Sequence, residues 1–364
     1  MEIQNLNLHN FRNYKNEKIQ FSPGVNVLQG QNGQGKTNVL EGIYYLLTGK
    51  SYRAHREQEM ICWGENAFHI FGDFLAYQRQ LSLESHYLDK HKIVKINNVS
   101  CKKLSDYVGT VNVVFFSPDD LIMVKGGPAE RRRFLDLHIT QLYVRHVHLL
   151  NDYNKVIHQK AALLKSPYQA SKVSNIELWN EQVLDLGSKI IRNRWNFTQI
   201  LAKKSQEIYT QLSSGEEELG LNYLALGYQD TEKALREFPQ MLEEKMKLEI
   251  ERQMILVGPH RDDLDFQLNG KSARIYASQG QQRSIVLSLK LAELEVIFQE
   301  KGEYPLLLLD DVLSELDIFR REYLLEFIKP IRQALITMTS AEKLSTTEIV
   351  SLFRVEKGHI GRIY

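Results

Sequence analysis

The chain has 364 residues, and its 46 Lys and Arg against 45 Asp and Glu leave a formal net charge of +1, which excludes a whole-surface attraction to nucleic acid. Its length allows two domains, or one domain with a large insertion. The two cysteines, Cys62 and Cys101, fit no metal or redox spacing. Because the N-terminus has no signal-peptide pattern and no apolar run is long enough to cross a bilayer, we expect a soluble, cytoplasmic protein without a membrane contact.

The chain begins with short strand-like runs around one helix. Apolar and polar residues alternate over 2–29 and again over 67–116, which predicts strands. Between these stretches, residues 37–48 predict a helix, and Gly49 follows it in the place where a left-handed C-cap is required.

The pattern becomes helical from residue 117. Ser117 as N-cap, Pro118 at the first helical position and two following acids predict the start of a helix. Apolar residues spaced by threes, fours and sevens over 183–212 predict one sustained helix face. The strand-like LNYLAL at 221–226 shows that this stretch is not one long coiled coil.

Strand-like runs return towards the C-terminus: MILVG at 254–258, LDFQL at 264–268, PLLLL at 305–309, ALITM at 334–338 and SLFRVEKG at 351–358. Strand-rich ends around a helical middle predict an α/β fold with mixed β-sheets, split by an insertion. We expect a discontinuous domain over 1–122 and 250–364, and a mainly helical insertion over 123–249.

A glycine-rich segment between the third strand and the first helix fits the pattern G-x-x-x-x-G-K-[ST]. Backbone N–H groups of such a loop point at phosphate oxygens, and the helix N-terminus adds positive potential. We expect Lys36 to reach the β- and γ-phosphates of ATP, and Thr37 to ligate Mg²⁺. A glycine-rich turn that only caps a helix is the alternative. The expected nucleotide-binding residues are Gly30, Gln31, Asn32, Gly33, Gln34, Gly35, Lys36, Thr37 and Asn38.

Two aspartates end the apolar run at 305–309. Carboxylates beside a buried strand are costly unless a cation compensates them, so a metal site is the simplest explanation. We expect Asp310 to hold Mg²⁺, and Asp311 to orient or deprotonate the water that attacks the γ-phosphate. The alternative is that both acids only cap the next turn.

A third motif changes the class of protein that the sequence predicts. Ser278-Gln279-Gly280-Gln281 opens an apolar helix, with Ser278 as its expected N-cap, and Ser314-Glu315-Leu316-Asp317 follows Asp310. In this order the motifs resemble those of the ATP-binding-cassette (ABC) ATPases. The resemblance implies that Ser278, Gly280 and Gln281 grip the γ-phosphate of ATP held by a second copy, in a head-to-tail dimer. A plain helix cap is the alternative.

Three further segments resemble the RecF family of bacterial recombination proteins, over essentially the whole chain. They are residues 8–14 (LHNFRNY), residues 124–136 with the pattern G-x-P-x-x-R-R-x-F-L-D, and residues 258–264 with the pattern G-P-H-R-x-D-L. The resemblance implies an ATP-dependent DNA-binding protein of recombinational repair, a weak DNA-stimulated ATPase that dimerises on ATP. It also implies binding to duplex and gapped DNA, and action with RecO and RecR to load RecA.

Two departures from the ABC pattern predict a switch and not a motor. Asp311 stands where most ABC ATPases have a glutamate, one methylene longer, so we expect slow hydrolysis. Thr339 and Ser340 follow ALITM where many have a histidine, and neither hydroxyl carries the positive charge of an imidazole. No Q-loop glutamine can be assigned near 115–120.

Several basic residues are candidates for a ligand contact. Arg12 fits a nucleotide contact as well as it fits an exposed strand arginine. His260 and Arg261 have no role that their chemistry assigns. For the arginine run in 124–136, a solvated helix face is the alternative to DNA contact. Lys50, Arg53 and Arg56 form a basic cluster in which Tyr52 is interleaved. The candidates for DNA are Lys50, Arg53, Arg56, Arg131 and Arg132.

Two other functional classes compete with this interpretation. One is a P-loop kinase with Asp311 or Asp317 as its base, against which the motif at Ser278 argues. The other is the ABC ATPase subunit of a transporter or a nuclease. The large helical insertion argues against a transporter subunit, and no nuclease carboxylate cluster is found elsewhere in the sequence.

Overall fold

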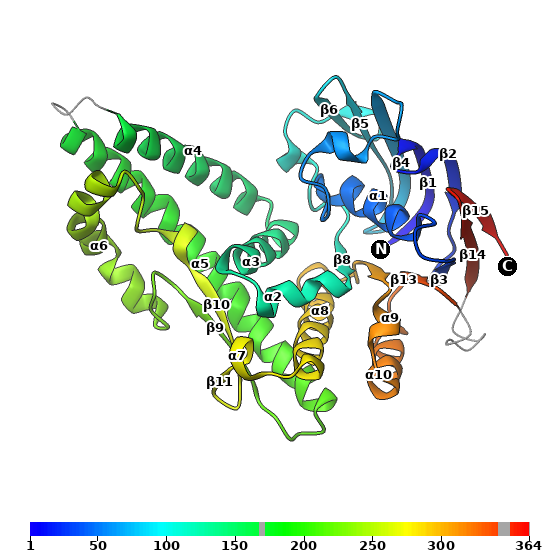
Figure 1. The fold of residues 1–364 in the computed structure, drawn as a ribbon. Helices are drawn as coiled ribbons and strands as arrows, with labels where there is room; N and C mark the ends of the chain where they lie inside the picture. The colour runs from blue at the N-terminus through cyan, green and yellow to red at the C-terminus, as the bar shows by residue number, and fades with distance from the viewer. Residues whose placement is uncertain (167–171, 341–349, 364) are drawn as a thin grey trace. The chain divides into compact units, whose positions relative to one another are not determined.

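The computed structural model describes residues 1–166, 172–340 and 350–363 (Figure 1). The chain folds into two compact units: the sheet unit, Met1–Asp120 with Lys290–Tyr364, and the helical unit, Leu121–Leu289. The compact units meet at 120/121 and 289/290, whereas the sequence predicts domain borders at 122/123 and 249/250. The predicted domain borders stay a prediction. Within the described residues, none of the helices is long and apolar enough to cross a membrane.

The first sheet of the sheet unit is antiparallel throughout, in the order β2-β1-β4-β5-β6-β7. Side chains alternate between buried and more exposed along β4, as a half-buried strand requires. The strand regions predicted over 2–29 and 67–116 supply all strands of this sheet, and two strands of the next: here they are β1 (Glu2–Phe11), β2 (Tyr14–Gln20), β4 (Ala67–Ala76), β5 (Arg79–Leu88), β6 (His91–Ile96) and β7 (Val99–Ser100).

The second sheet has the order β15-β14-β3-β13-β12-β8 and is parallel from β14 to β8. Its central strands are buried on both faces, which explains their continuous apolar runs. The carboxyl ends of parallel strands meet at one edge, where ligands bind in such sheets. The strands are β3 (Gly24–Gln29), β8 (Val113–Phe116), β12 (Leu306–Asp310), β13 (Gln333–Met338), β14 (Ser351–Glu356) and β15 (His359–Arg362).

Helix α1 (Lys36–Thr48) packs against strands of both sheets. Most of its side chains are buried, as expected of a helix enclosed on all sides. It ends at Gly49, whose φ of 72° is left-handed and whose N–H donates to the Tyr45 carbonyl, so the predicted C-cap is confirmed. The described part of this unit also contains α9 (Val312–Glu315), α10 (Ile318–Ile328) and the 3-10 turns Glu57–Met60 and Leu104–Asp106.

The helical unit is built around the long helix α5, which packs against α4, α6 and β9. The apolar face predicted over 183–212 is confirmed, since Val183, Ile190 and Phe197 are among its buried residues. Three strands form a small antiparallel sheet, β11-β10-β9. The elements are α2 (Ile122–Lys125), α3 (Pro128–Leu142), α4 (Arg145–Lys165), α5 (Lys172–Leu212), β9 (Leu219–Leu224), α6 (Thr231–Arg252), β10 (Asp263–Leu268), β11 (Lys271–Ser272), α7 (Ala273–Tyr276) and α8 (Gln279–Lys301), which continues into the sheet unit.

One predicted strand is wrong. MILVG at 254–258 has no strand conformation. The Met254 N–H donates to the Glu249 carbonyl at 3.2 Å, and the Leu256 N–H donates to the Glu249 carboxylate at 2.7 Å. Because α6 takes up these donors locally, they cannot join a sheet. The helix start predicted at Ser117 is a 3-10 turn over Pro118–Leu121, followed by the single turn of α2.

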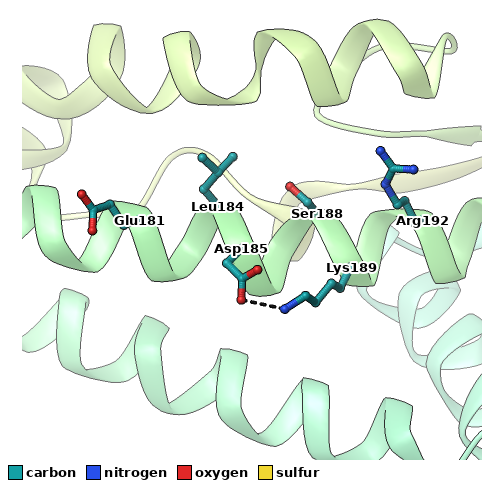
Figure 2. A pocket seen from close by; sticks show the side chains of 6 residues that line it. All are labelled: Glu181, Leu184, Asp185, Ser188, Lys189 and Arg192. Atoms are coloured by element: carbon teal, nitrogen blue, oxygen red, sulfur yellow. Dashed lines mark hydrogen bonds and ion pairs between the residues drawn. The ribbon is translucent and has the colours of Figure 1, made fainter.

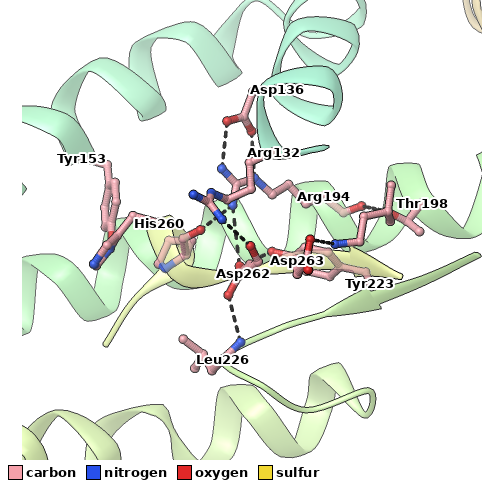
Figure 3. Close-up of polar contacts among 12 residues, drawn as sticks. Arg132, Asp136, Tyr153, Arg194, Thr198, Tyr223, Leu226, His260, Asp262 and Asp263 are labelled. Carbon is pink, nitrogen blue, oxygen red and sulfur yellow. Dashed lines mark hydrogen bonds and ion pairs between the residues drawn. The ribbon is translucent and has the colours of Figure 1, made fainter. Parts of the chain in front are cut away.

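A buried polar network holds the helical unit together (Figure 3). Arg131 on α3 donates to both carboxylate oxygens of Asp263, at 2.7 and 3.0 Å. Arg194 on α5 donates to both oxygens of Asp136 at 2.8 Å, and to the Pro259 carbonyl at 2.7 Å. The segments 124–136 and 258–264, far apart in sequence, therefore meet in one cluster of ion pairs.

Asp262 is the most enclosed acid of this network. Its carboxylate accepts hydrogen bonds from the Leu226 N–H at 2.8 Å and from the Tyr223 hydroxyl. Its backbone carbonyl accepts a bond from Arg132 at 2.6 Å. Burial raises the pKa of the Asp262 carboxyl, and the Arg194 guanidinium opposes this shift. Such a network stabilises one arrangement only while every member keeps its partner.

We expect Arg131→Met to lower the free energy of unfolding by about 1–3 kcal/mol, because the buried guanidinium is the donor to the partly exposed Asp263 carboxylate and to the carbonyls of Met123 and Gly126. Arg133→Met is the matched control: Arg133 is exposed on the same helix, and its loss should cost no more than about 0.5 kcal/mol. Chemical denaturation of the full chain, followed by circular dichroism, measures both. Equal effects of the two substitutions would contradict a structural role for Arg131.

Candidate functional site

The predicted phosphate loop joins β3 to α1 and depends on its glycines. A Cβ atom on Gly30 would lie 2.3 Å from the Val355 carbonyl oxygen, and one on Gly35 would lie 2.5 Å from the Asn13 amide. Gly35 also has a φ of 115°, which L side chains rarely adopt. The backbone can therefore follow this tight path only with glycine at these positions.

Two turns of the sheet unit brace this loop. From the β1–β2 turn, the Asn13 amide donates to the Gln34 carbonyl at 3.0 Å, and the Tyr14 hydroxyl donates to the Gly35 carbonyl at 2.9 Å. From the β14–β15 turn, the Lys357 N–H donates to the Gln34 side chain at 2.7 Å. Sequence reasoning assigned no role to Asn13 or Tyr14, and their place in the segment 8–14 was the signal that could have indicated one.

Lys36 is held inside the loop. Its ammonium donates to the carbonyls of Gly30 at 2.6 Å and Gln31 at 2.9 Å. Burial lowers the pKa of Lys36, and the charges of Asp311 and Asp310 oppose this shift. The loop therefore encloses a cation at the point where its backbone curls, an arrangement suited to a multiply charged anion.

Asp310 joins the loop to the second sheet. One of its carboxylate oxygens accepts hydrogen bonds from the Thr37 hydroxyl at 2.8 Å and from the Thr337 hydroxyl at 2.7 Å. Burial raises the pKa of Asp310, whereas the bonds from Thr337 and Thr37 lower it. Sequence reasoning missed Thr337. Its signal was the apolar run 334–338, because β13 pairs with β12 so that Thr337 lies opposite Asp310.

Asp311 has a fixed and unusual backbone. Its φ of 53° is left-handed, and its N–H donates to the Thr337 hydroxyl at 2.9 Å. The Ser314 hydroxyl donates to the Asp311 carboxylate at 2.9 Å. The carboxylate makes no hydrogen bond that caps α9, so the alternative in which this acid serves as a cap has no support in its contacts.

The donor set around Thr37 fits a magnesium ion that a nucleotide brings with it. A hydroxyl and a carboxylate lie 2.8 Å apart, and both are the hard oxygen ligands that Mg²⁺ prefers. Among the residues that the structure describes, no group of three or more His, Cys, Asp or Glu is arranged to hold a metal. Phosphate oxygens and water would have to complete the shell, as is usual for Mg²⁺ at phosphate sites.

Arg12 is not an exposed strand arginine, and hydrogen bonds fix the position of its guanidinium group. It lies in the β1–β2 turn and donates to both carboxylate oxygens of Glu41, at 2.9 and 2.6 Å, and to the Glu59 carbonyl at 2.6 Å. Glu41 is 0% exposed and also accepts the Ser51 hydroxyl at 2.6 Å. Contact of Arg12 with a nucleotide stays a prediction. Glu41, which sequence reasoning missed, links this turn to α1.

The basic cluster after α1 is exposed at Lys50, Arg53 and Arg56. Arg53 donates to the Asn38 side chain at 3.2 Å, which places it beside the phosphate loop. The Tyr52 ring is not presented for stacking on a nucleic-acid base. It packs on the Phe115 ring, with 4.0 Å between the ring centroids. DNA contact by the three basic residues stays a prediction, without an aromatic partner in Tyr52.

Arg131 and Arg132 do not form a solvated basic face. Arg131 is 3% exposed and paired with Asp263, so the prediction that it contacts DNA is corrected: its charge is already compensated inside the helical unit. Arg132 is half-buried and donates to the Asp262 carbonyl. The sequence pattern of the run was compatible with an exposed face, because its partners are distant: Asp263 lies 132 positions from Arg131, and Asp262 lies 130 positions from Arg132.

Ser278 caps α8 in the reciprocal manner of a capping box. The Ser278 hydroxyl accepts the Gln281 N–H at 3.2 Å, and the Gln281 side chain accepts the Ser278 N–H at 2.7 Å. The predicted N-cap is confirmed. Gly280 is exposed, and a Cβ there would meet only the Ser278 hydroxyl, at 4.0 Å. Ser278 can cap α8 and also contact a phosphate. Its contact with the γ-phosphate of ATP held by a second copy stays a prediction.

A groove on α5 is not a candidate ligand-binding site (Figure 2). It has a volume of about 410 Å³, and every residue that lines it belongs to this one helix. Asp185 and Lys189 in its lining form an ion pair at 2.8 Å. Charges of both signs on a single open helix face select no ligand class. The lining residues are Glu181, Leu184, Asp185, Ser188, Lys189 and Arg192.

The sequence is similar over its whole length to bacterial DNA replication and repair proteins. Residues 2–361 match the family model described as RecF/RecN/SMC N terminal domain. A protein of Desulfitobacterium hafniense (strain DSM 10664 / DCB-2), named DNA replication and repair protein RecF, is 66% identical over 100% of both chains. The protein of the same name from Halalkalibacterium halodurans is 41% identical over 99% of both chains.

Solved structures are also similar. The recombination mediator protein RecF with ATP, of the RecFOR pathway, matches with a TM-score of 0.92 and 31% identity, over 100% of this chain and 97% of that chain. An Smc head bound to the C-winged helix domain of ScpA matches with a TM-score of 0.58 and 17% identity, over 100% of this chain and 97% of that chain, which shows a shared fold alone. The chain has the ABC-type ATPase head fold of these proteins and belongs to the RecF family of the RecF/RecN/SMC proteins.

Proposed function

We propose that the chain is an ATP-dependent DNA-binding protein of recombinational repair. The observation that carries this proposal is the contact of Thr37 with Asp310 beside a braced phosphate loop. It is supported by the relatives named DNA replication and repair protein RecF and by the similar structure that holds ATP. We infer that it acts with RecO and RecR to load RecA at single-stranded gaps, since that structure belongs to the RecFOR pathway.

The phosphate loop binds the β- and γ-phosphates of ATP. On binding, the Lys36 ammonium exchanges the carbonyls of Gly30 and Gln31 for phosphate oxygens, while the backbone N–H groups of the loop supply further donors. Thr37 and Asp310 hold Mg²⁺, which neutralises part of the phosphate charge. The remaining nucleotide contacts belong to residues 30–38 and Arg12.

We expect Lys36→Ala to weaken ATP binding roughly 10- to 100-fold, because the loop loses its point charge on the phosphates and keeps only backbone donors. Lys329→Ala removes an exposed lysine of the same unit and should leave the affinity unchanged. Equilibrium titration with a fluorescent ATP analogue measures both. Wild-type affinity in Lys36→Ala would remove the nucleotide assignment of the loop.

Asp311 acts as the base that orients or deprotonates the attacking water. Its backbone is held by Thr337 and its carboxylate by Ser314, so its direction is fixed before a substrate arrives. Aspartate is one methylene shorter than the glutamate of most ABC ATPases, and Thr339 and Ser340 supply no imidazole charge. Both features favour a weak ATPase that serves as a switch. Its stimulation by DNA is part of the same proposal and is suggested by the resemblance to the RecF proteins.

ATP assembles two copies head to tail, with Ser278, Gly280 and Gln281 of each copy on the γ-phosphate of the other. Because Ser278 also caps α8, two substitutions separate the two roles. Ser278→Arg removes the cap, whereas Ser278→Asp keeps a capping oxygen and adds a negative charge towards the γ-phosphate.

We expect ATP to convert the wild-type monomer to a dimer, and both Ser278 variants to stay monomeric while they bind ATP with unchanged affinity. In Ser278→Asp, repulsion between the introduced carboxylate and the phosphate would block assembly even with the helix capped. Light scattering with and without ATP measures the mass. If Ser278→Asp dimerises as wild type does, Ser278 is only a helix cap.

DNA binding follows from assembly. A net charge of +1 is too small to attract duplex strongly to a monomer. A dimer brings two copies of the cluster Lys50, Arg53 and Arg56 to one DNA duplex. It therefore neutralises more DNA phosphates than a monomer does.

We expect ATP to raise duplex affinity and also to steepen its salt dependence, by about 0.9 in log–log slope for each added phosphate contact. Lys36→Ala should abolish both effects. Fluorescence anisotropy across a salt series, with and without a slowly hydrolysed ATP analogue, provides the test. Identical slopes and affinities in the two conditions would contradict an ATP-gated clamp.

A further inference from the structure

A cluster of one ammonium and two carboxylates lies within the sheet unit, where the chain leaves and re-enters it. Asp120 is the last residue of the first segment of this unit, and Lys290 is the first residue of the second. The Lys290 ammonium is 3.2 Å from one Asp120 oxygen and 3.7 Å from one Glu293 oxygen. Both covalent connections to the helical unit therefore begin at this cluster.

The cluster is enclosed and carries one carboxylate more than it has cations. The side chains of Lys290, Asp120 and Glu293 are 7%, 17% and 0% exposed. Burial raises the pKa of Glu293 to about 8; Lys290 opposes this shift and Asp120 adds to it. Burial also raises the pKa of Asp120, and the Lys290 charge opposes that shift. The Lys290 ammonium lies within ion-pair distance of both acids and closer to Asp120, so the cluster has two acceptors for one cation.

Asp120 also closes the turn at the end of β8. Its second oxygen accepts the Ser117 N–H at 2.7 Å. Phe116, the last residue of β8, pairs with Leu309, so Ser117, directly after β8, lies at the same sheet edge as Asp310, the last residue of β12. The ion pair thus links this edge, where Thr37 meets Asp310, to α8, which begins directly after Ser278.

We propose that Lys290 is a latch that exchanges between Asp120 and Glu293. The closed state has the Asp120 pair described here. In the open state, Lys290 pairs with Glu293, three residues further along the same helix, and Glu293 gives up its proton to solvent. The turn 117–121 is then released from α8.

Glu293 makes this exchange feasible. An ammonium left alone in a buried site is strongly unfavourable, so an ion pair without a substitute partner opens rarely. A second carboxylate on the same helix compensates Lys290 in both states. Asp120 and Glu293 are thus positioning residues: they set the place of α8 and of the turn, and touch no nucleotide.

Two isosteric substitutions should act in opposite directions. In Asp120→Asn the amide oxygen still accepts the Ser117 N–H, but Lys290 loses its ionic partner and moves to Glu293, which locks the latch open. In Glu293→Gln the amide mimics the protonated acid but cannot take the charge of Lys290, which locks the latch closed. Glu300→Gln, at an exposed position of α8, is the matched control.

Hydrogen–deuterium exchange of the full-length chain, followed at the amides of Ser117 and of residues 119–121, reports the latch without any nucleotide. We expect exchange at least about tenfold slower than wild type in Glu293→Gln, faster than wild type in Asp120→Asn, and unchanged in Glu300→Gln. A shift in the same direction for both latch variants would overturn the proposal, because a merely structural cluster loosens when either acid is replaced. The melting temperature of each variant verifies that it is folded.

A second arm adds Mg²⁺ and a slowly hydrolysed ATP analogue, and it rests on the proposed function. Exchange at 117–121 should respond to the analogue in wild type and in Glu300→Gln, and in neither latch variant, although all bind the analogue with equal affinity. A wild-type response in the latch variants would overturn the coupling. Absence of analogue binding in every protein would instead contradict the proposed function and leave the result of the first arm standing.

Discussion

One carboxylate oxygen of Asp310 connects segments that lie 273 and 27 residues away along the chain, through the hydroxyls of Thr37 and Thr337. The start of α1, the end of β12 and the end of β13 are fixed by this shared acceptor. Because Asp310 is buried, its charge is maintained at a cost that the two hydroxyls offset in part. The fold thus holds an anion beside the Lys36 cation, in the arrangement that a metal-bound triphosphate requires.

The two units use polar groups for different purposes. In the sheet unit, hydroxyls and amides such as those of Thr337 and Asn13 aim the backbone and one acid at the phosphate loop. In the helical unit, arginines join distant elements: Arg131 of α3 binds Asp263 at the start of β10, and Arg194 of α5 binds Asp136 of α3. Close resemblance of a segment to a family does not by itself make its residues ligand contacts, since Arg131 and Arg132 in the segment 124–136 bind other parts of the helical unit.

Local patterns predicted much of the fold and of the site. The phosphate loop, the strand that ends at Asp310, the C-cap at Gly49 and the N-cap at Ser278 each depend on neighbours within a few residues. Thr337, Glu41 and the partners of Arg131 could not be predicted, because they depend on strand register or on contacts between distant segments. The strand predicted for MILVG at 254–258 was wrong for a related reason. An apolar run looks the same whether it pairs in a sheet or packs against a helix end, and here the Glu249 carboxylate accepts the Leu256 N–H that a neighbouring strand would need.

The central claim is that Thr37 and Asp310 are placed to hold a magnesium ion together with ATP. Equilibrium titration of wild-type protein with a fluorescent ATP analogue, once with Mg²⁺ and once with EDTA, tests it most directly. We expect Mg²⁺ to tighten binding at least about tenfold, because a cation relieves the repulsion between the buried carboxylate and the phosphates. Equal affinity in the two conditions would contradict this claim.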